Sequence, residues 1–291
     1  MQHPPCPPSQ QLAQLRNEAN QDAKDQAQFF FSDNAQNKRA RGGRWTGPPP
    51  KQCWFCMSSE QYEAHLVASI AEAAYVALPK GGINGDHVLI VPVEHHPALV
   101  NAPIPVRKEV ELYKASLAKY YAAKGQYMVA FERVAITRNP AHTHMQVIGL
   151  PAANAAAAPP IIRAEAARAG VPVTPLPHGE SLQDYVVTAL HGNVPMQYLY
   201  VELHAPPPGK AADGVSEVPE VHRFLHVVPE GASQPLQFGR DLMCALLQLP
   251  HRKHWRDCKL AQEQEEQLTN TFREGFQAHD FAADEDSSDS E

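Results

Sequence analysis

The stretch HTHMQVIGL, residues 142–150, predicts a strand around which the rest of the fold can be placed. Polar and apolar residues alternate through its first half, and its second half is apolar. Alternate residues of a strand point to opposite faces, so His142, His144 and Gln146 are expected on one surface and their apolar neighbours on the other. The stretch therefore predicts a sheet that carries three polar side chains in a row.

Other apolar patterns supply the elements that pack around this strand. Strands are predicted over residues 64–70, 73–78, 87–91 and 127–133. Residues 106–124 space their apolar side chains three and four apart, which predicts an amphipathic helix that ends at Gly125. Further along, the patterns predict a short helix over residues 164–169, a hairpin over 197–203 and 223–228, and helices over 238–249 and 260–276. The fold class is therefore α+β, in two units.

Changes in composition divide the chain into five segments. Residues 152–160, AANAAAAPP, interrupt the apolar pattern, and the proline-rich residues 205–219 are typical of a loop between two strands. The expected segments are a disordered basic arm over residues 1–51, a first domain over 52–151, a linker with a short helix over 152–196, a second domain over 197–283 and a disordered acidic tail over 284–291.

The charge of the chain is uneven along its length. The 291 residues hold 25 Lys and Arg against 32 Asp and Glu, a net charge of -7. Seven basic and four acidic residues lie in the arm, whereas the tail holds five acidic residues and no basic one. The arm is interpreted as a nuclear-import patch, an RNA-contacting tether or a plain solvated linker. Because the tail supplies so much of the negative charge, the overall acidity is weak evidence against an RNA partner.

The sequence shows neither a membrane span nor a secretion signal. No stretch approaches the roughly 20 consecutive apolar residues that a span requires. The first residues, MQHPP, lack the charged-then-apolar pattern of a signal peptide. A soluble, intracellular protein is therefore expected.

Five cysteines, including a Cys53-x-x-Cys56 pair, favour thiols kept for chemistry over a disulfide scaffold. The pair has the spacing of zinc sites, but a tetrahedral site needs two further ligands. The candidates for these are His95, His96, His142 and His144. A redox couple and two unconnected thiols are the alternatives.

The polar row of His142, His144 and Gln146 is also suited to catalysis. A neutral imidazole can attack a phosphorus centre, and a neighbouring amide can orient it or donate to the leaving oxygen. The alternatives are that these side chains are ordinary polar residues on an open sheet face, or that they serve only as metal ligands.

The order of these motifs resembles the histidine-triad superfamily. A CxxC pair, the strand end HVLIVPVEH at residues 87–95, a helix and the HTHMQ motif at residues 142–146 follow in the same order. Glutamine at the third position resembles the nucleotidyl-transferase branch, the hexose-phosphate uridylyltransferases. Residues 29–283 resemble more closely the C-terminal part of CwfJ-family proteins. The stretches that carry this resemblance are FFF at 29–31, CWFC at 53–56, ALPKGG at 77–82, DHVLI at 86–90, FER at 131–133, QVI at 146–148, YVEL at 200–203, PLQFGR at 235–240 and HWRDC at 254–258.

The resemblance implies an antiparallel sheet with a central helix, followed by a smaller α+β C-terminal domain. It implies a structural Zn²⁺ ion whose ligands are Cys53, Cys56, His95 and His142. His96 is a possible substitute for His95, while His144 falls at the nucleophile position and Gln146 at the third position of the triad. Full-length relatives carry an N-terminal metallophosphoesterase-like domain, which this chain lacks, so the chain is interpreted as a fragment or a truncated gene product.

The chain departs from the pattern of active histidine-triad hydrolases at two places. Residues 75–78, YVAL, lack the Asp or Asn that binds ribose, and residues 136–140, ITRNP, lack the Gly/Ser loop that holds phosphate. A nucleotidyl hydrolase or transferase that uses His144 and Gln146 is therefore kept as the alternative to a binding protein, and enzymatic activity is left open.

Cationic and aromatic side chains offer contacts to phosphate and RNA in both domains. The residues suited to phosphate by charge in the first domain are Lys80, His87, Arg133 and Arg138. In the second domain, stacking on bases or pairing with phosphates is expected of Arg240, Trp255 and Arg256. The alternative for Trp255 is packing in the groove between the last two helices, with the charges facing water.

The expected function is that of a nuclear accessory factor in pre-mRNA splicing and intron-lariat turnover, which binds RNA or a ribonucleoprotein through a zinc-bearing domain. Its expected partners are RNA and spliceosomal or lariat-debranching proteins, with no membrane. The chain is expected to be a monomer.

Overall fold

The computed structural model describes residues 53–135, 142–207, 218–232 and 234–283. The expected basic arm, the expected acidic tail and the candidate phosphate ligand Arg138 lie outside these ranges. A helix with the length and apolar character of a membrane crossing is absent from the described ranges.

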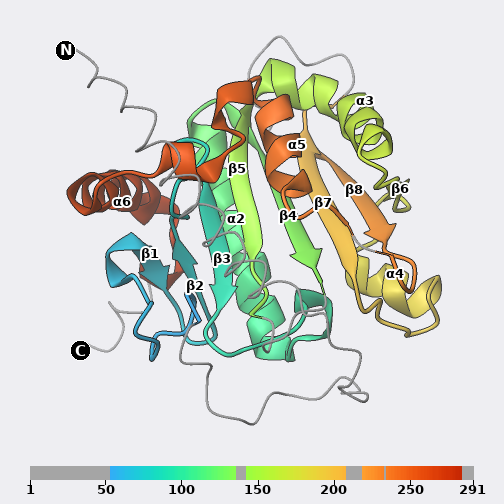
Figure 1. The fold of residues 1–291 in the computed structure, drawn as a ribbon, viewed down its shortest axis with the longest axis horizontal. Helices are drawn as coiled ribbons and strands as arrows, with labels where there is room; N and C mark the ends of the chain where they lie inside the picture. Colours follow the sequence, from blue (N-terminus) through green and yellow to red (C-terminus); the bar gives the residue numbers. More distant parts are fainter. Residues whose placement is uncertain (1–52, 136–141, 208–217, 233, 284–291) are drawn as a thin grey trace, which may run out of the picture.

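One antiparallel sheet of eight strands organises the described residues (Figure 1). Its strands are β1 (Val67–Ile70), β2 (Ala74–Ala77), β3 (Val88–Pro92), β4 (Gln126–Val134), β5 (Met145–Pro151), β6 (Thr174–Pro175), β7 (Tyr198–Ala205) and β8 (Glu220–Val227). They lie in the order β1-β2-β3-β5-β4-β7-β8-β6, and each neighbouring pair is antiparallel. The predicted α+β class with an antiparallel sheet is confirmed.

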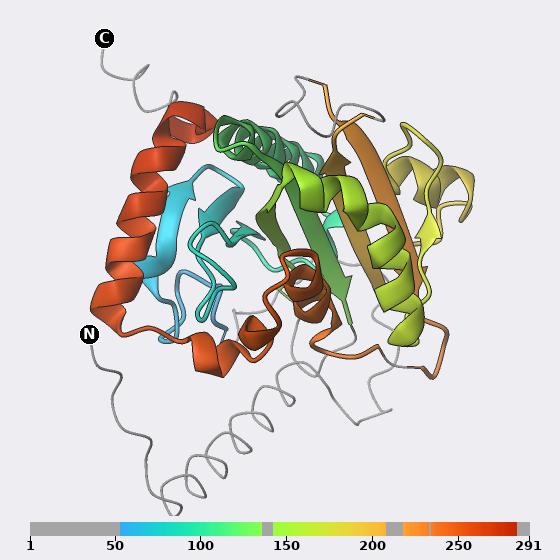
Figure 2. The same ribbon diagram turned by 90° about the horizontal axis from the view of Figure 1, so that it is seen from above.

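Helices cover both faces of this sheet (Figure 2). They are α2 (Ile104–Ala123), α3 (Ala152–Arg168), α4 (Leu182–Thr188), α5 (Phe238–Leu246) and α6 (Gln262–Phe276). Helices α2 and α4 pack in a hydrophobic core on one face of the sheet. Helices α3 and α5 pack in a second core on the opposite face. Helix α6 packs at one edge of the sheet, against β1 and the 3-10 turn η1 (Ala64–Leu66).

The central strand β4 shows how alternating side chains build the two cores. Val129 and Phe131 pack with α3 and α5, whereas Met128 and Ala130 belong to the core of α2. Because side chains alternate along a strand, Arg133 lies on the same face as Phe131. That face, on the side of α5, is where the pocket described below is found.

The second part of the chain extends the sheet of the first part. The predicted helix over 106–124 is confirmed as α2, and the predicted hairpin is confirmed as β7 and β8. Strand β7 pairs with β4 over six residue pairs, so strands from both predicted units form one continuous sheet. Sequence patterns do not reveal this pairing, because neither strand carries a local signal for its partner.

Residues 152–160, predicted as an interruption between two domains, form instead the first half of helix α3. The prediction gave too much weight to Pro159 and Pro160 and too little to the alanines, which have the highest helix propensity. Both prolines lie inside the helix, whose buried Ala155 and Ala158 pack in the core shared with α5. This packing offsets the backbone hydrogen bonds that the prolines remove.

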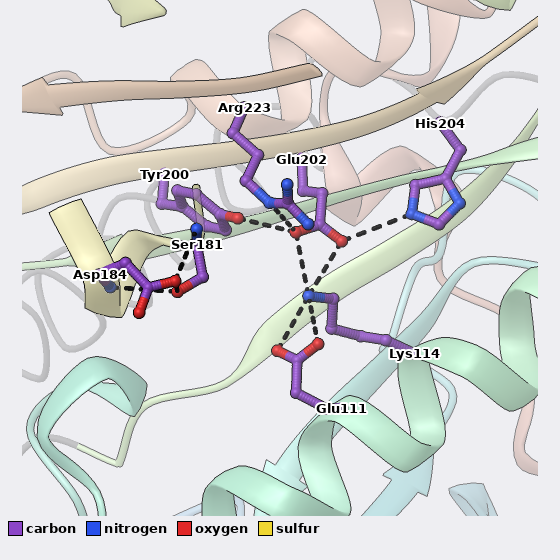
Figure 3. Close-up of polar contacts among 8 residues, drawn as sticks. All are labelled: Glu111, Lys114, Ser181, Asp184, Tyr200, Glu202, His204 and Arg223. Carbon is purple, nitrogen blue, oxygen red and sulfur yellow. Dashed lines mark hydrogen bonds and ion pairs between the residues drawn. The ribbon is translucent and has the colours of Figure 1, made fainter. Parts of the chain in front are cut away.

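A buried ion cluster joins helix α2 to strands β7 and β8 (Figure 3). Glu202 of β7 is 2% exposed, and its carboxylate accepts hydrogen bonds from Lys114 of α2, from Arg223 of β8 and from Tyr200. Burial by itself would raise the pKa of Glu202, but the ion pairs, that with Lys114 above all, hold it well below its usual range. The cluster fixes the central helix against the second part of the sheet.

Candidate metal centre and adjoining pocket

Four sulfur and nitrogen ligands meet beside the end of strand β3. They come from Cys53, Cys56, His95 and His142. Their ligand atoms lie within 4.8 Å of one another, and all four residues are buried. His95 Nε2 lies 2.7 Å from Cys56 Sγ, and His142 Nδ1 lies 3.4 Å from Cys53 Sγ. The structure therefore brings together the four residues expected as zinc ligands.

The two ring nitrogens of His142 have different roles. Nε2 donates to the backbone carbonyl of Pro92 at 2.7 Å, which leaves the lone pair of Nδ1 facing the sulfur atoms. Ligating histidines are commonly fixed by such a hydrogen bond from the second nitrogen. Burial and the neighbouring His95 lower the pKa of His142 to about 3. The ring is therefore neutral at physiological pH and able to act as a ligand.

The donor set fits a tetrahedral zinc ion. Zn–S bonds of about 2.3 Å and Zn–N bonds of about 2.0 Å separate neighbouring ligand atoms by roughly 3.5 Å. The closest sulfur–nitrogen distances in the cluster run from 2.7 to 3.7 Å. Burial and the neighbouring Cys53 raise the pKa of the Cys56 thiol to about 12. Two ionised thiols at this spacing need a cation between them, which a divalent metal would supply.

His96, considered as a substitute for His95, lies outside this group of four but supports it. Its backbone carbonyl accepts the N–H of Thr143 at 2.9 Å. Glu132 adds a second tie, because its carboxylate accepts the hydroxyl of Thr143 at 2.6 Å and the backbone N–H of Leu99 at 2.8 Å. These contacts join the two histidine-bearing segments. Sequence patterns did not identify Glu132, since one acidic residue in an apolar strand has no distinctive spacing.

The three polar side chains expected in a row divide between two neighbouring sites. Strand β5 begins at Met145, so both histidines lie just before it. His142 belongs to the metal centre, whereas His144 and Gln146 line a pocket. The ring of Phe55 contacts both histidines, with centroids 5.7 Å from His142 and 4.7 Å from His144. The metal centre and the pocket are therefore neighbours that share one aromatic wall.

This pocket of about 630 Å³ opens on the face of the sheet that α5 covers. Residues 54–63 form one wall, and α5 with the 3-10 turn η4 (Trp255–Cys258) contributes to the other. The predicted site residues that line it are Lys80, His87, Arg133, His144, Gln146, Arg240 and Trp255. Both parts of the chain thus build a single pocket.

His87 orients the amide of Gln146 in this pocket. His87 is 1% exposed, its Nδ1 accepts the backbone N–H of Ile83 at 3.2 Å, and its Nε2 donates to Oε1 of Gln146 at 3.2 Å. Burial and the guanidinium of Arg240 lower the pKa of His87 to about 3. The ring is neutral at physiological pH, so it positions Gln146 instead of attracting phosphate by charge, the role expected of it from the sequence.

His144 presents a neutral imidazole to the same pocket. It is half-buried, and burial lowers its pKa to about 4. Its Nδ1 lies 3.5 Å from the carbonyl oxygen of His142, a long contact that leaves Nε2 as the nitrogen with a free lone pair. Such a nitrogen can accept a hydrogen bond or act as a nucleophile.

Arg133 and Lys80 bring positive charge to the pocket in different ways. Arg133 is half-buried, and burial lowers its pKa to about 10, which leaves the guanidinium charged at neutral pH. Lys80 forms an ion pair with Glu63 at the rim, which neutralises its charge. Both side chains line the pocket and are candidates for a phosphate contact.

The second part of the chain contributes an aromatic wall. Arg240 Nε donates to two backbone carbonyl oxygens at 2.9 Å, so its guanidinium fixes the segment before Trp255. Trp255 packs edge-on against Trp54, with ring centroids 6.4 Å apart. Arg256, expected at an RNA contact, is not among the lining residues. Its guanidinium lies 5.0 Å from the centroid of the Trp255 ring, and the ammonium of Lys259 lies 4.6 Å from the same centroid. Trp255 is thus a wall of the pocket supported by two cations.

A loop between β2 and β3 docks on this wall. Arg252 donates to the carbonyl oxygens of Gly82 and Ile83 at 2.8 and 3.0 Å. Gly81 has a φ of +65°, and a Cβ there would lie 2.2 Å from the carbonyl oxygen of Trp255. Glycine is required at this close approach. The ALPKGG and HWRDC stretches therefore share one structural role, that of closing the pocket.

Three further lining residues, Trp54, Phe55 and Lys259, were not singled out from the sequence. Trp54 and Phe55 lie between the two cysteines, and the CxxC spacing predicts a role only for the cysteines. Two aromatic residues inside a CxxC motif are a signal that could have identified them, because few turns expose such side chains without a partner.

The buried neutral His87 predicts a loss of stability in mild acid. The pKa of an unfolded histidine is about 6.5, whereas that of folded His87 is about 3. Above pH 6.5, His87 is neutral in both the folded and the unfolded state and does not make the unfolding free energy depend on pH. Between pH 6.5 and 3 the unfolded state binds a proton that the folded state does not, so the unfolding free energy falls by up to about 1.4 kcal/mol per pH unit. The His87→Asn variant should lack this pH dependence.

Urea unfolding at a series of pH values measures this effect. Below pH 6.5, the unfolding free energy of His87→Asn should fall less steeply than that of the wild type. The difference between the two slopes should correspond to the uptake of close to one proton on unfolding. His251→Asn, which removes an exposed histidine, is the matched control for the substitution itself. Equal slopes for the wild type and His87→Asn would show that His87 is not held neutral.

The fold and the site define an α+β protein in which a Cys₂His₂ cluster adjoins a polar and aromatic pocket. Residues 44–163 match the family model described as "Protein similar to CwfJ C-terminal". Residues 181–282 match the one described as "Protein similar to CwfJ C-terminus 2". The chain belongs to the CwfJ family.

Curated relatives agree with these matches. CWF19-like protein 1 of Xenopus laevis is 33% identical over 271 residues, which cover 87% of this chain and 45% of that protein. CWF19-like protein 1 of Homo sapiens is 31% identical over 278 residues, 89% of this chain and 46% of that protein. Zinc finger CCCH domain-containing protein 64 of Arabidopsis thaliana is 33% identical over 230 residues, 79% of this chain and 36% of that protein. The chain spans less than half the length of these relatives.

A solved chain described as "Structure of uridylyltransferase" has a TM-score of 0.39 and 14% sequence identity, over 84% of this chain and 97% of that chain.

Proposed function

We propose that the chain is an accessory factor of pre-mRNA splicing and intron-lariat turnover that acts in the nucleus and binds RNA in the pocket beside the metal centre. Its partners are spliceosomal or lariat-debranching proteins. The observation that carries the proposal is a single pocket of about 630 Å³ to which both family-matched segments contribute polar, cationic and aromatic side chains.

The lining of the pocket suits an unstacked nucleotide. The guanidinium of Arg133 supplies charge for a phosphate, and the Gln146 amide offers both donors and an acceptor. Trp54, Phe55 and Trp255 provide aromatic surfaces on which bases can stack, as is common in the recognition of single-stranded RNA. Single-stranded RNA, bound through one or two nucleotides, is the ligand class that this combination favours.

Zinc has a structural role in this proposal. Cys53, Cys56, His95 and His142 supply four protein ligands, the number that closed structural sites use, so no position is left for substrate. The ion would fix residues 53–56 against the segments that carry the two histidines. Because Trp54 and Phe55 lie within that turn, the metal centre would also hold one wall of the RNA pocket.

The CwfJ and CWF19-like relatives support a splicing-related role, and through it a nuclear location. These relatives are more than twice as long as the part that this chain matches. The role of the whole protein is therefore part of the proposal, and the pocket is the part that this chain can test on its own.

Fluorescence anisotropy with a labelled single-stranded RNA tests the pocket. The zinc-loaded chain is titrated over a series of salt concentrations, as wild type and as Arg133→Gln. The variant should bind about tenfold more weakly and should lower the salt slope by about one, because one phosphate contact is lost. Measured affinities at one salt concentration would not separate this contact from nonspecific attraction.

Arg163→Gln is the matched control, because it removes the same charge from the exposed side of helix α3. It should bind RNA like the wild type. Equal affinity and salt slope for Arg133→Gln and Arg163→Gln would contradict RNA binding in the pocket, and no measurable RNA affinity would leave a scaffold role.

A nucleotidyl hydrolase or transferase is the second candidate function, and the neutral His144 in the pocket favours it. Its Nε2 would attack a phosphorus atom of a nucleotide conjugate, the bond to the leaving group would break, and a covalent nucleotidyl-histidine would form. Incubation with labelled conjugates should then transfer label to the wild type and not to His144→Ala. No turnover over a panel of conjugates would exclude this function.

A further inference from the structure

A second group of metal-binding side chains lies between η1 and helix α6. Glu63 and His65 come from the start of η1, and Glu265 comes from the first turns of α6. Their ligand atoms lie within 4.8 Å of one another. All three line an open pocket of about 460 Å³ that contains no residue of the Cys₂His₂ cluster. The chemistry of this pocket is therefore separate from that of the metal centre.

Two carboxylate oxygens of this group have no hydrogen-bond partner among the residues that the structure describes. Glu265 is 4% exposed; its Oε2 accepts a hydrogen bond from His65 Nε2 at 2.9 Å, but its Oε1 is buried and unpartnered. Glu63 pairs with Lys80 through Oε1, while its Oε2 is buried without a hydrogen bond. A buried acceptor without a partner destabilises the folded state. A cation beside these oxygens would remove that cost.

We propose that Glu63, His65 and Glu265 bind a divalent cation. Two carboxylates and one imidazole give oxygen and nitrogen ligands, which suit Mn²⁺ and related ions, whereas thiolates suit zinc. The two carboxylates carry two negative charges, and Lys80 offsets only one of them. When the cation binds, His65 gives the lone pair of Nε2 to it, and the proton that Nε2 donates to Glu265 moves to Nδ1 through solvent.

The cation would compete with Lys80 for Glu63. Lys80 lines both this pocket and the larger one. A cation on Glu63 therefore frees the ammonium group for a phosphate in the larger pocket, so the two sites are coupled. This coupling rests on the proposed RNA-binding function, whereas cation binding itself does not.

Titration of the zinc-loaded chain with Mn²⁺, by calorimetry and by electron paramagnetic resonance, tests the site. Zinc keeps the thiolate cluster occupied, so added Mn²⁺ reports on the carboxylate site. One Mn²⁺ should bind per chain, and Glu265→Gln should weaken this binding by roughly tenfold or more. Glu266→Gln removes the same charge from the exposed neighbouring residue and should bind Mn²⁺ like the wild type.

Absence of Mn²⁺ binding by the wild type at millimolar concentration, or equal binding by the wild type and Glu265→Gln, would overturn the site. His65→Gln gives the same comparison if Glu265→Gln does not fold. Tighter RNA binding in the presence of Mn²⁺, lost in Lys80→Gln, is the result expected from the coupling. Binding of Mn²⁺ without any RNA affinity would overturn the proposed function and leave the cation site standing.

Discussion

The Cys53→Ala variant is expected to lose zinc and stability together. Four buried ligand atoms within 4.8 Å of one another are held by three separate segments of the chain. Structural zinc has an apparent binding free energy of about 10–16 kcal/mol in small domains, so loss of one thiolate removes several kcal/mol of folding free energy. Elemental analysis should find one zinc per wild-type chain and none in the variant, with a clearly lower melting temperature.

Two control variants separate loss of the metal from loss of packing. Cys244→Ala removes a buried thiol in the core of α5, and His96→Ala removes the histidine next to His95. Both should keep zinc, since neither residue belongs to the group of four. Full zinc occupancy in both Cys53→Ala and His142→Ala would show that the ligand assignment is wrong.

The Lys114→Met variant is expected to lose about 3 kcal/mol of unfolding free energy. Lys114 is 5% exposed and its ammonium donates to Glu202 at 3.0 Å, so the substitution leaves a buried carboxylate with fewer cations. Breaking a buried pair by removing one partner costs about 3–5 kcal/mol, and Arg223 still pairs with Glu202 in the variant. The lower end of that range is therefore expected in urea unfolding at neutral pH.

The pH dependence of this loss identifies its cause. The ion pairs hold the pKa of folded Glu202 well below the value of about 4.5 for a free carboxyl. Their contribution is therefore complete above pH 4.5 and is lost as the pH falls through the lower folded value, so the difference between variant and wild type should shrink in acid. Lys119→Met, on the exposed side of α2, should be neutral. A difference that does not change with pH would point to packing alone.

The residues of the candidate metal centre were predicted in two steps. The CxxC pair and the chemistry of metal ligands left four histidines as candidates, and the family resemblance implied His95 and His142 among them, the two that the structure places beside the cysteines. The strand predicted over residues 142–150 begins later than expected. Its pairing with β3 and β4 starts at Met145, and His142, which lies before the strand, contacts Pro92 and Cys53.

The shape of the pocket could not be predicted, because it depends on contacts between distant segments. Trp255 of η4 and Arg240 of α5 line the same pocket as His144 and Arg133, which lie about a hundred residues earlier in the chain. Charge alone did not distinguish the roles of Arg133 and Arg240, which both line the pocket, although the donors of Arg240 bind backbone carbonyls. Helix α3 shows the same limit, since its two prolines lie inside a helix whose buried side chains pack against distant segments.

RNA binding in the pocket is tested most directly by photo-cross-linking. Single-stranded RNA containing 4-thiouridine is bound to the zinc-loaded chain, irradiated, and the cross-linked residues are identified by mass spectrometry. Cross-links are expected at Trp54, Phe55 and Trp255, and they should weaken in Arg133→Gln but not in Arg163→Gln. Bound RNA that cross-links elsewhere on the chain, with none of these three aromatic residues labelled, would contradict the proposal.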